Sequence, residues 1–187
     1  SRKGNFSSIK TQAYPGIDIH IRDAWAQYES IPNKRPVTVA LIDTGVDISH
    51  PELKNAIWTN ADEIPDDGID NDGNGYIDDV HGWNFLANTN QIYVGREDVH
   101  GTHAAGTIGA SKKDGGIMGI TDNSYVKIMV LKALGGEEGS GSPESVISAI
   151  RYAEANGAQI CNLSFGAREV TQEFIDTIKN SSMLFIV

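Results

Sequence analysis

The stretch Val37-Thr38-Val39-Ala40-Leu41-Ile42-Asp43-Thr44-Gly45 decides the fold, because an apolar, β-branched run ends there in an acidic turn. Such a run is typical of a strand that is buried on both faces. Asp43 would lie at the carboxyl end of that strand, where open α/β sheets place ligands and catalytic groups. Turns also favour Asp and Gly, so this stretch taken alone favours an ordinary strand-end turn.

Other apolar runs and helical patterns surround this strand along the chain. Further buried strands are predicted over residues 126–131, 159–164 and 183–187. Helices are predicted over residues 18–28, 143–156 and 170–180, and residues 1–16 are expected to form an irregular N-terminal arm. Strands that alternate with helices indicate an α/β protein, with a largely parallel sheet and helices on both faces. We therefore expect one domain over residues 17–187.

Composition and charge exclude several classes of partner. The chain has 25 acidic and 15 basic residues, and its net charge of −10 argues against binding to nucleic acid or an anionic membrane surface. No apolar run is long enough to span a membrane. No signal peptide is recognisable, so we expect a cytosolic protein or one that has lost a leader. The single cysteine, Cys161, is expected to be a buried, inert thiol.

Acidic residues are concentrated between Asp62 and Asp79, where eight carboxylates occur without a basic residue. Oxygen-bearing side chains alternate from Asp70 to Asn74 and precede Gly75, which matches the start of a calcium loop of the EF-hand type. The usual glutamate at the twelfth position is absent, so an aspartate would have to complete the shell. The alternative is a solvated acidic loop without an ion. The pattern predicts a Ca²⁺ site in an insertion at about residues 62–80, with ligands Asp70, Asp72, Asn74, the Tyr76 carbonyl, Asp78 and Asp79.

Small residues dominate residues 97–110, which read EDVHGTHAAGTIGA. A helix of such residues can pack close to a neighbouring sheet. His100 and His103 lie three residues apart at its start, and hence on about the same face. A histidine held by a rigid first turn is well placed for proton transfer. Taken alone, two ordinary packed histidines explain this stretch equally well.

A glycine-rich loop at residues 135–142 lies between a predicted strand and a predicted helix, an order that phosphate sites also show. The loop contains neither G-x-G-x-x-G nor G-x-x-x-x-G-K-[ST]. Glu137 and Glu138 would also repel a phosphate. A nucleotide site is therefore not expected here.

Taken together, four segments resemble the subtilisin-like serine proteases, or subtilases. Residues 39–47, VALIDTGVD, are similar to the Asp motif of that family, and residues 100–107, HGTHAAGT, are similar to its His motif. Gly139-Ser140-Gly141 resembles the edge segment that pairs with an extended substrate, and residues 162–166, NLSFG, resemble the opposite wall of the cleft. Asp before His also agrees with the chain order Asp…His…Ser of subtilisin. A subtilisin-like α/β fold is the implied architecture.

The resemblance implies a serine endopeptidase that cleaves peptide or protein substrates by a Ser-His-Asp triad. His100 would be the general base and Asp43 would orient it, while His103 and Asn162 would be packed structural neighbours of the site. Many members of the family bind calcium, which agrees with the predicted Ca²⁺ loop. Substrate binding would involve Gly139, Ser140, Gly141, Ser164, Phe165 and Gly166.

The nucleophilic serine of the family lies in a G-T-S-M-A-like segment and its oxyanion-hole asparagine in an A-A-G-N-like segment, and these 187 residues contain neither. We therefore expect the N-terminal portion of a subtilase catalytic domain, inactive alone and completed by a complementary C-terminal portion. Two alternatives stay open: a non-catalytic relative that binds a peptide or partner, and a calcium-binding structural module. Secretion is expected, because calcium loops of modest affinity suit extracellular calcium concentrations.

Overall fold

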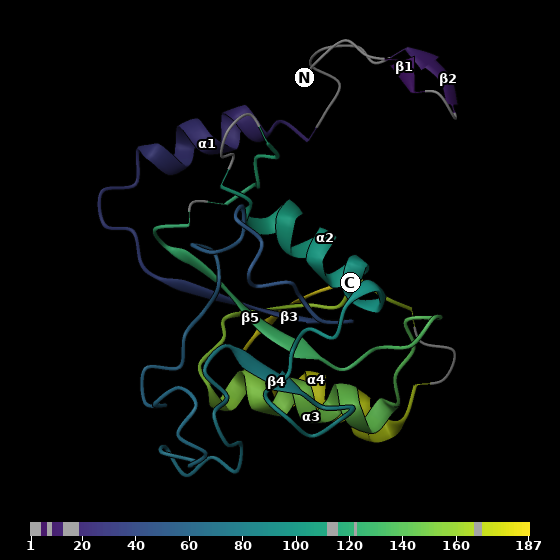
Figure 1. The fold of residues 1–187 in the computed structure, drawn as a ribbon. Helices are drawn as coiled ribbons and strands as arrows, with labels where there is room; N and C mark the ends of the chain where they lie inside the picture. The colour runs from purple at the N-terminus through teal and green to yellow at the C-terminus, as the bar shows by residue number, and fades with distance from the viewer. Residues whose placement is uncertain (1–4, 7–8, 13–18, 112–115, 122, 167–169) are drawn as a thin grey trace. The chain divides into compact units, whose positions relative to one another are not determined.

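The computed structural model describes residues 5–6, 9–12, 19–111, 116–121, 123–166 and 170–187 (Figure 1). The chain divides into two compact units, Ser1–Arg35 and Pro36–Val187. The first unit contains an antiparallel strand pair, β1 (Asn5–Phe6) and β2 (Ile9–Gln12), and helix α1 (Ile21–Glu29). Part of the arm predicted to be irregular is therefore paired, and the helix predicted over 18–28 begins at Ile21. The expected boundary after residue 16 falls inside this unit.

The second unit is built on a five-stranded sheet in which all neighbouring strands run parallel. The four strands predicted from apolar runs are all present, although the last two are shorter than predicted. A fifth strand, β4, contains only three residues and has no long apolar run to mark it in the sequence. In spatial order the strands are β4 (Gly82–Asn84), β5 (Val126–Lys132), β3 (Val37–Asp43), β6 (Ile160–Asn162) and β7 (Leu184–Ile186).

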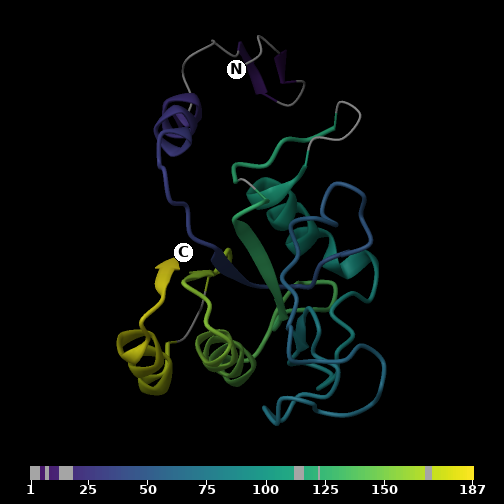
Figure 2. The same ribbon diagram turned by 90° about the vertical axis from the view of Figure 1, so that its left-hand side faces the viewer.

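Helices cover both faces of this sheet. Helix α2 (Val99–Gly109) lies on one face, and α3 (Pro143–Ala155) and α4 (Gln172–Asn180) lie on the other (Figure 1, Figure 2). The alternation of β3 explains this, since Ala40 and Ile42 pack into the core with α3 whereas Leu41 packs into the core with α2. The expected α/β class with a largely parallel sheet is confirmed. Within the described residues, none of the helices has the length and apolar character to cross a membrane.

Helix α3 begins and ends where its sequence signals indicate. The Ser142 Oγ accepts a hydrogen bond from the Ser145 N–H at 3.2 Å, and Pro143 occupies the first turn, where its missing N–H is not needed. After the helix, Gly157 has a φ of 72°, the left-handed conformation that commonly ends helices. The start of α3 is thereby fixed directly after the glycine-rich loop at residues 135–142.

Strand β7 is an edge strand, and the prediction that the final strand is buried is wrong. It pairs with β6 on one side, and among the described residues no strand pairs with its other side. Leu184 and Ile186 are 59% and 48% exposed. An apolar run predicts a strand, but its burial depends on a neighbouring element that composition does not reveal.

Candidate active site

Asp43 and His100 lie in hydrogen-bond contact although 57 residues separate them. The Nδ1 of His100 is 2.8 Å from Oδ1 and 3.0 Å from Oδ2 of Asp43. Asp43 is 1% exposed at the end of β3, whereas the His100 side chain is 57% exposed in the first turn of α2. A carboxylate only accepts, so Nδ1 donates and Nε2 is left free to accept a proton.

Small residues let the two elements approach each other. A Cβ on Gly101 would lie 2.2 Å from the carbonyl oxygen of Gly45, so α2 reaches the turn after β3 only with glycine there. Thr44 then joins the two, because its Oγ1 accepts the Gly101 N–H at 3.1 Å while its own N–H donates to Asp43 Oδ1 at 2.6 Å. The Asp-Thr-Gly sequence thus orients the carboxylate and anchors the helix that carries the imidazole.

A buried lysine, which the sequence analysis does not single out, lies beside this pair. Lys132 ends β5 opposite Asp43 and is 2% exposed. Its Nζ is 2.6 Å from Asp98 Oδ1 and 2.9 Å from Glu97 Oε1, and it donates to the Thr44 carbonyl at 2.5 Å. The hydrogen bond to Lys132, followed by its charge, lowers the pKa of the Glu97 carboxyl. A lysine closing the run V-K-I-M-V-L-K is the sequence signal that points to it.

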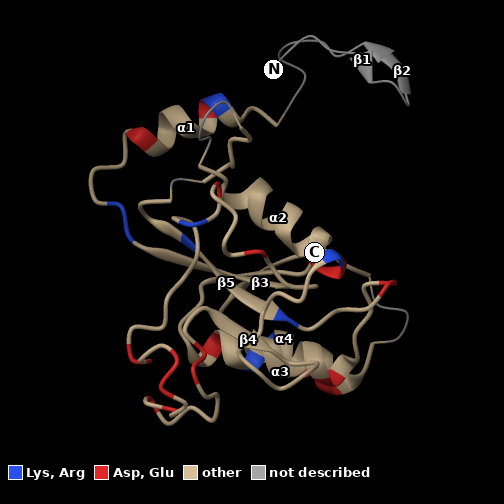
Figure 3. Ribbon diagram, in the orientation of Figure 1, with Lys and Arg blue, Asp and Glu red and all other residues tan. Residues whose placement is uncertain are grey.

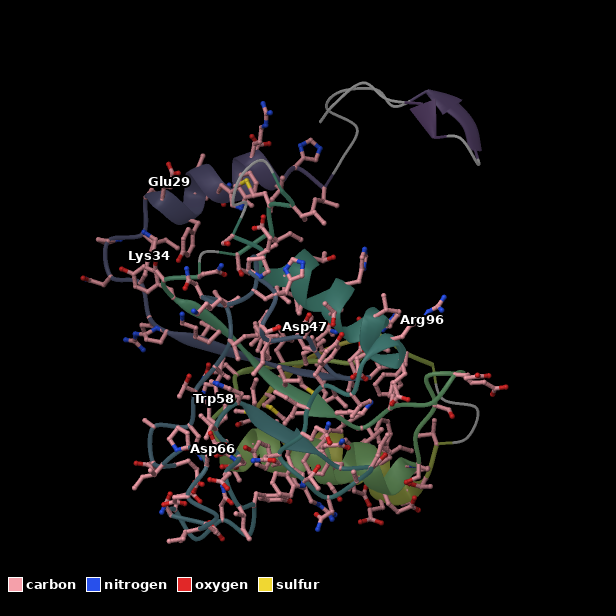
Figure 4. All side chains as sticks on the ribbon, viewed as in Figure 1. Glu29, Lys34, Asp47, Trp58, Asp66 and Arg96 are labelled. Atoms are coloured by element: carbon pink, nitrogen blue, oxygen red, sulfur yellow. The ribbon has the colours of Figure 1, made fainter. Side chains whose placement is uncertain are left out.

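His100 faces a hollow of about 710 Å³, and a second hollow of similar volume adjoins it. Leu134, Glu138, Gly139 and Phe165 line both hollows, so they form one continuous cleft. The start of α2 borders the first hollow, and Figure 4 shows the Arg96 side chain there pointing away from the ribbon. The start of α3 borders the second hollow.

All six residues expected to contact substrate line this cleft. Three of them line the first hollow, and five line the second, because two residues line both. Ser140 pairs with Gly135 through both backbone groups, at 2.9 and 3.0 Å, which closes residues 136–139 into a turn. Ser164 lines the first hollow alone, Gly139 and Phe165 line both hollows, and the second alone is lined by Ser140, Gly141 and Gly166.

The two expected structural neighbours differ in outcome. Asn162 lies in β6 and its Nδ2 donates to the Ser164 Oγ at 2.8 Å, so it supports a cleft residue. His103 is exposed and lines neither hollow, so the expectation of a packed neighbour is wrong. A step of three residues turns an α-helix by about 300°, which is short of a full turn. His103 is therefore offset around the helix axis from His100, and this offset is enough to expose it to solvent.

Comparison with known proteins assigns the chain to a family. A family model described as "Subtilase family" matches residues 34–187, which include the whole of the sheet-containing unit. The chain belongs to the subtilase family. It is 36% identical over 145 residues to the "Major intracellular serine protease" of Bacillus subtilis (strain 168), a match that covers 78% of this chain and 39% of that protein.

Solved structures confirm that the fold is subtilisin-like. The crystal structure of a lanthipeptide protease matches with a TM-score of 0.51 and 25% identity, over 84% of this subtilase chain and 37% of that chain. Fervidolysin from Fervidobacterium pennivorans is described as a keratinolytic enzyme related to subtilisin. It matches with a TM-score of 0.54 and 24% identity, over 77% of this chain and 19% of that chain. The chain therefore spans less than half the length of these relatives.

The acidic loop of this subtilase brings three carboxylates together. Oxygens of Glu63, Asp72 and Asp79 lie within 4.8 Å of one another, and Figure 3 shows acidic residues concentrated along this loop. Glu63 is 6% exposed and Asp79 is 0% exposed. Within the described part of the chain, none of the three forms an ion pair with Lys or Arg. Buried carboxylates without a counter-ion are a donor set that a hard cation stabilises, so the residues fit a metal such as Ca²⁺.

The predicted ligands are only partly gathered at this point. Asn74 joins Asp72 and Asp79, because its Nδ2 lies 3.0 and 2.9 Å from an oxygen of each. The carboxylate of Asp70 instead accepts the Gly75 N–H at 2.8 Å, and this hydrogen bond is the main cause that lowers the pKa of Asp70. Positions along the loop motif therefore do not fix which oxygens converge.

The predicted ligand Asp78 has contacts of another kind, and Tyr76, whose carbonyl is the predicted ligand, packs its side chain against the core. The Asp78 carboxylate accepts backbone N–H groups from residues 67 and 68, both at 3.1 Å, on a turn of the loop near the labelled Asp66 (Figure 4). The Tyr76 ring packs edge-on against Trp83 and Tyr152, and burial raises the pKa of its phenol. Glu63, which the structure adds to the group, precedes the motif and has no signature in its spacing.

Proposed function

We propose that this chain provides the general base and the orienting carboxylate of a serine endopeptidase. The contact of His100 Nδ1 with both carboxylate oxygens of Asp43, at 2.8 and 3.0 Å beside the cleft, carries the proposal. Asp43 holds the imidazole in the tautomer whose Nε2 accepts a proton, and it stabilises the imidazolium that forms.

The reaction follows from this arrangement. A serine hydroxyl on the open side of His100 gives its proton to Nε2 while its oxygen attacks the carbonyl carbon of the scissile peptide bond. His100 then returns the proton to the leaving amine, and water repeats both steps to release the acyl group. An extended peptide lies in the cleft and adds as a strand beside residues 139–141.

The nucleophilic serine and the oxyanion-hole asparagine are proposed to come from polypeptide outside these 187 residues. This complementary portion would be joined to the chain or associated with it. The match to the Bacillus subtilis relative covers 39% of that protein, so relatives contain ample further sequence. The 187 residues alone are expected to hydrolyse no peptide.

The test uses the whole protein that contains this chain, a peptide substrate, and a fluorophosphonate that labels activated serines. We expect His100→Ala to abolish labelling and to lower kcat by about 10⁴-fold or more. His103→Ala is the matched control, since this second histidine is exposed on the same helix, and it should keep wild-type activity. A folded wild-type protein that is never labelled and cleaves nothing would contradict the proposal and favour a non-catalytic peptide-binding relative.

We further propose that the acidic loop binds Ca²⁺. The three clustered carboxylates, of which Glu63 and Asp79 are buried, would act as oxygen ligands, and the cation would offset the repulsion between them. Bound calcium would stabilise the loop without a part in the reaction.

We also propose that the protein is extracellular. Assaying culture medium and cell extract separately for the protein tests this location.

Thermal unfolding in a chelator and in millimolar calcium tests the calcium site. Calcium should raise Tm. At a free calcium concentration 1,000 times Kd, binding should add about 4 kcal/mol to the free energy of unfolding. Asp72→Asn/Asp79→Asn should remove the response, while Asp62→Asn, in the same loop but outside the cluster, should keep it. An unchanged wild-type Tm over a wide calcium range would contradict a tight site.

A further inference from the structure

A buried lysine lies next to the proposed catalytic pair and has no part in the steps above. Lys132 is 2% exposed and is the largest fully enclosed side chain in the described part of the chain. An ammonium group loses its hydration in the interior, which is strongly unfavourable unless fixed acceptors replace the water. A buried lysine therefore indicates a set of contacts with a definite role.

The ammonium group has four acceptors. Its Nζ lies 2.6 Å from Asp98 Oδ1, 2.9 Å from Glu97 Oε1, 2.5 Å from the Thr44 carbonyl oxygen and 3.3 Å from the Leu134 carbonyl oxygen. Three N–H groups shared among four acceptors leave no donor unused. Lys132 is thus fully engaged by groups from three separate segments of the chain.

Two of these segments carry the proposed catalytic residues. Thr44 directly follows Asp43, and Asp98 precedes His100 by two residues. One ammonium group therefore joins the turn after β3 to the segment that begins α2. The bond to Thr44 acts one residue from the carboxylate, and the bond to Asp98 acts two residues from the imidazole.

Asp98 is a rigid acceptor. It is 0% exposed, and its Oδ2 accepts the Val94 N–H at 2.5 Å and the Gly95 N–H at 3.3 Å. A Cβ on Gly45 would lie 2.9 Å from the Asp98 carboxyl carbon, so the turn after β3 packs directly on this group. Lys132 therefore ties the turn to a carboxylate that cannot shift without moving its surroundings.

We propose that Lys132 is a positioning residue that holds the Asp43–His100 pair in register by binding Thr44 and Asp98 at the same time. Its kinetic consequence rests on the proposed peptidase function, but its structural consequence does not. A displacement of about 1 Å in such a pair lowers a rate by about 100-fold. A lysine that served only as a counter-ion for Asp98 would change stability and leave the pair intact.

The test compares Lys132→Met with Lys132→Met/Asp98→Asn in the whole protein that contains this chain. The single variant leaves a buried carboxylate unpaired and should melt at a lower temperature. The double variant removes both charges, and its Tm should return to within about 5 °C of the wild type. The control, Arg151→Met/Glu173→Gln, removes an ion pair whose side chains are 61% and 59% exposed, and should change nothing.

Two measurements report on the catalytic pair. The first is the low-field proton resonance of the His100 Nδ1–H, which its hydrogen bond to Asp43 produces. The second is the split between kcat and KM for a peptide substrate. We expect the double variant to lose or shift the resonance, and its kcat to fall about 100-fold with KM changed less than about threefold.

An unchanged resonance in the folded double variant would overturn the proposal, and so would a wild-type kcat in that variant. A wild-type protein that shows the resonance but cleaves no peptide would contradict the proposed function alone. The two failures are distinguishable because the resonance does not depend on a nucleophile or a substrate.

Discussion

The chemistry of Asp43 comes from its neighbours on three elements. Its carbonyl oxygen accepts N–H groups from Ala133 and Leu134, at 3.0 and 3.2 Å, so the end of β5 fixes its backbone. Its carboxylate is oriented by the next residue and contacts the imidazole of His100 with both oxygens. An ordinary strand-end aspartate would not need both constraints, and their presence favours a role in orienting the histidine.

Replacing Asp43 with asparagine should therefore separate orientation from binding. We expect Asp43→Asn to lower kcat of the whole protein by about 10⁴-fold, because the amide favours the wrong histidine tautomer, with KM little changed. Asp47→Asn is the control: this aspartate lies in the loop that follows β3, and its carboxylate accepts from Ser49. Equal losses of kcat in both variants would show that the loop as a whole, rather than Asp43, matters.

Cys161 offers a second prediction at this scale. It is 0% exposed, and burial raises the pKa of its thiol from 9.0 to about 12. The native protein should resist a maleimide, whereas the urea-unfolded protein should react at its one cysteine. The native thiol keeps its proton while the unfolded thiol ionises, so the free energy of unfolding should fall as pH rises from about 9 towards 12. Rapid labelling of folded protein would contradict this burial.

Asp43 and His100, which the structure brings into contact, lie in segments with a recognisable family pattern, although each segment alone also fits an ordinary structural role. Lys132 and Glu63 are not marked by such a pattern, because their roles come from partners that are distant in sequence, such as Thr44, which is 88 residues from the lysine. Burial of an isolated charge is visible only when the tertiary structure is known.

At the scale of single elements, α3 links the cleft to the acidic loop. Its first residues border the second hollow, and Tyr152 near its other end donates to the buried Asp79 at 2.5 Å. The Tyr152 ring also stacks edge-on with Tyr76, with centroids 4.9 Å apart. Burial, followed by the bond to Asp79, raises the pKa of Tyr152. The loop is therefore attached to the same helix that borders the cleft.

Removing the Tyr152 hydroxyl should weaken this attachment. We expect Tyr152→Phe to lower the free energy of unfolding by about 1.5–3 kcal/mol, because a buried carboxylate loses a donor. Urea unfolding with and without calcium measures the change. Tyr93→Phe is the control, since Tyr93 is 40% exposed. The same stability in both variants would mean that the bond to Asp79 contributes nothing.

The elements themselves were largely predictable, with two instructive exceptions. Strands β3 and β5 and helix α3 follow from apolar runs and from the cap at Ser142, which are local signals. Strand β4 has three residues and exists only because β5 offers it hydrogen bonds. For β7 the strand was predictable but its exposure was not, since burial is decided by what packs against it.

At the scale of the whole molecule, the exposed edge of β7 predicts the behaviour of these residues in isolation. Among the described strands, none pairs with the outer edge of β7 beside Leu184 and Ile186, so this edge is a template for another chain. Residues 1–187 expressed alone should self-associate, as measured by size-exclusion chromatography with light scattering. Adding the complementary portion in trans should suppress the association.

Charged substitutions test whether this edge is responsible. Leu184→Lys/Ile186→Lys should increase the fraction of soluble monomer, because charge on an edge strand opposes pairing with another chain. Val170→Lys is the control, since Val170 is 56% exposed but lies outside the sheet. A wild-type chain that is a soluble monomer with one cooperative melting transition would contradict the prediction.

The position of β3 also determines the order of events during synthesis. It is first of the five strands along the chain but central in the sheet, and its Thr38 N–H bonds to a side chain 121 residues later. At about 5–20 residues per second, β3 leaves the ribosome roughly 6–24 s before the second of its neighbours exists. Closing that long loop, rather than forming helices, should limit the folding rate. The yield of native protein is then governed by how long the nascent strand is shielded from other chains.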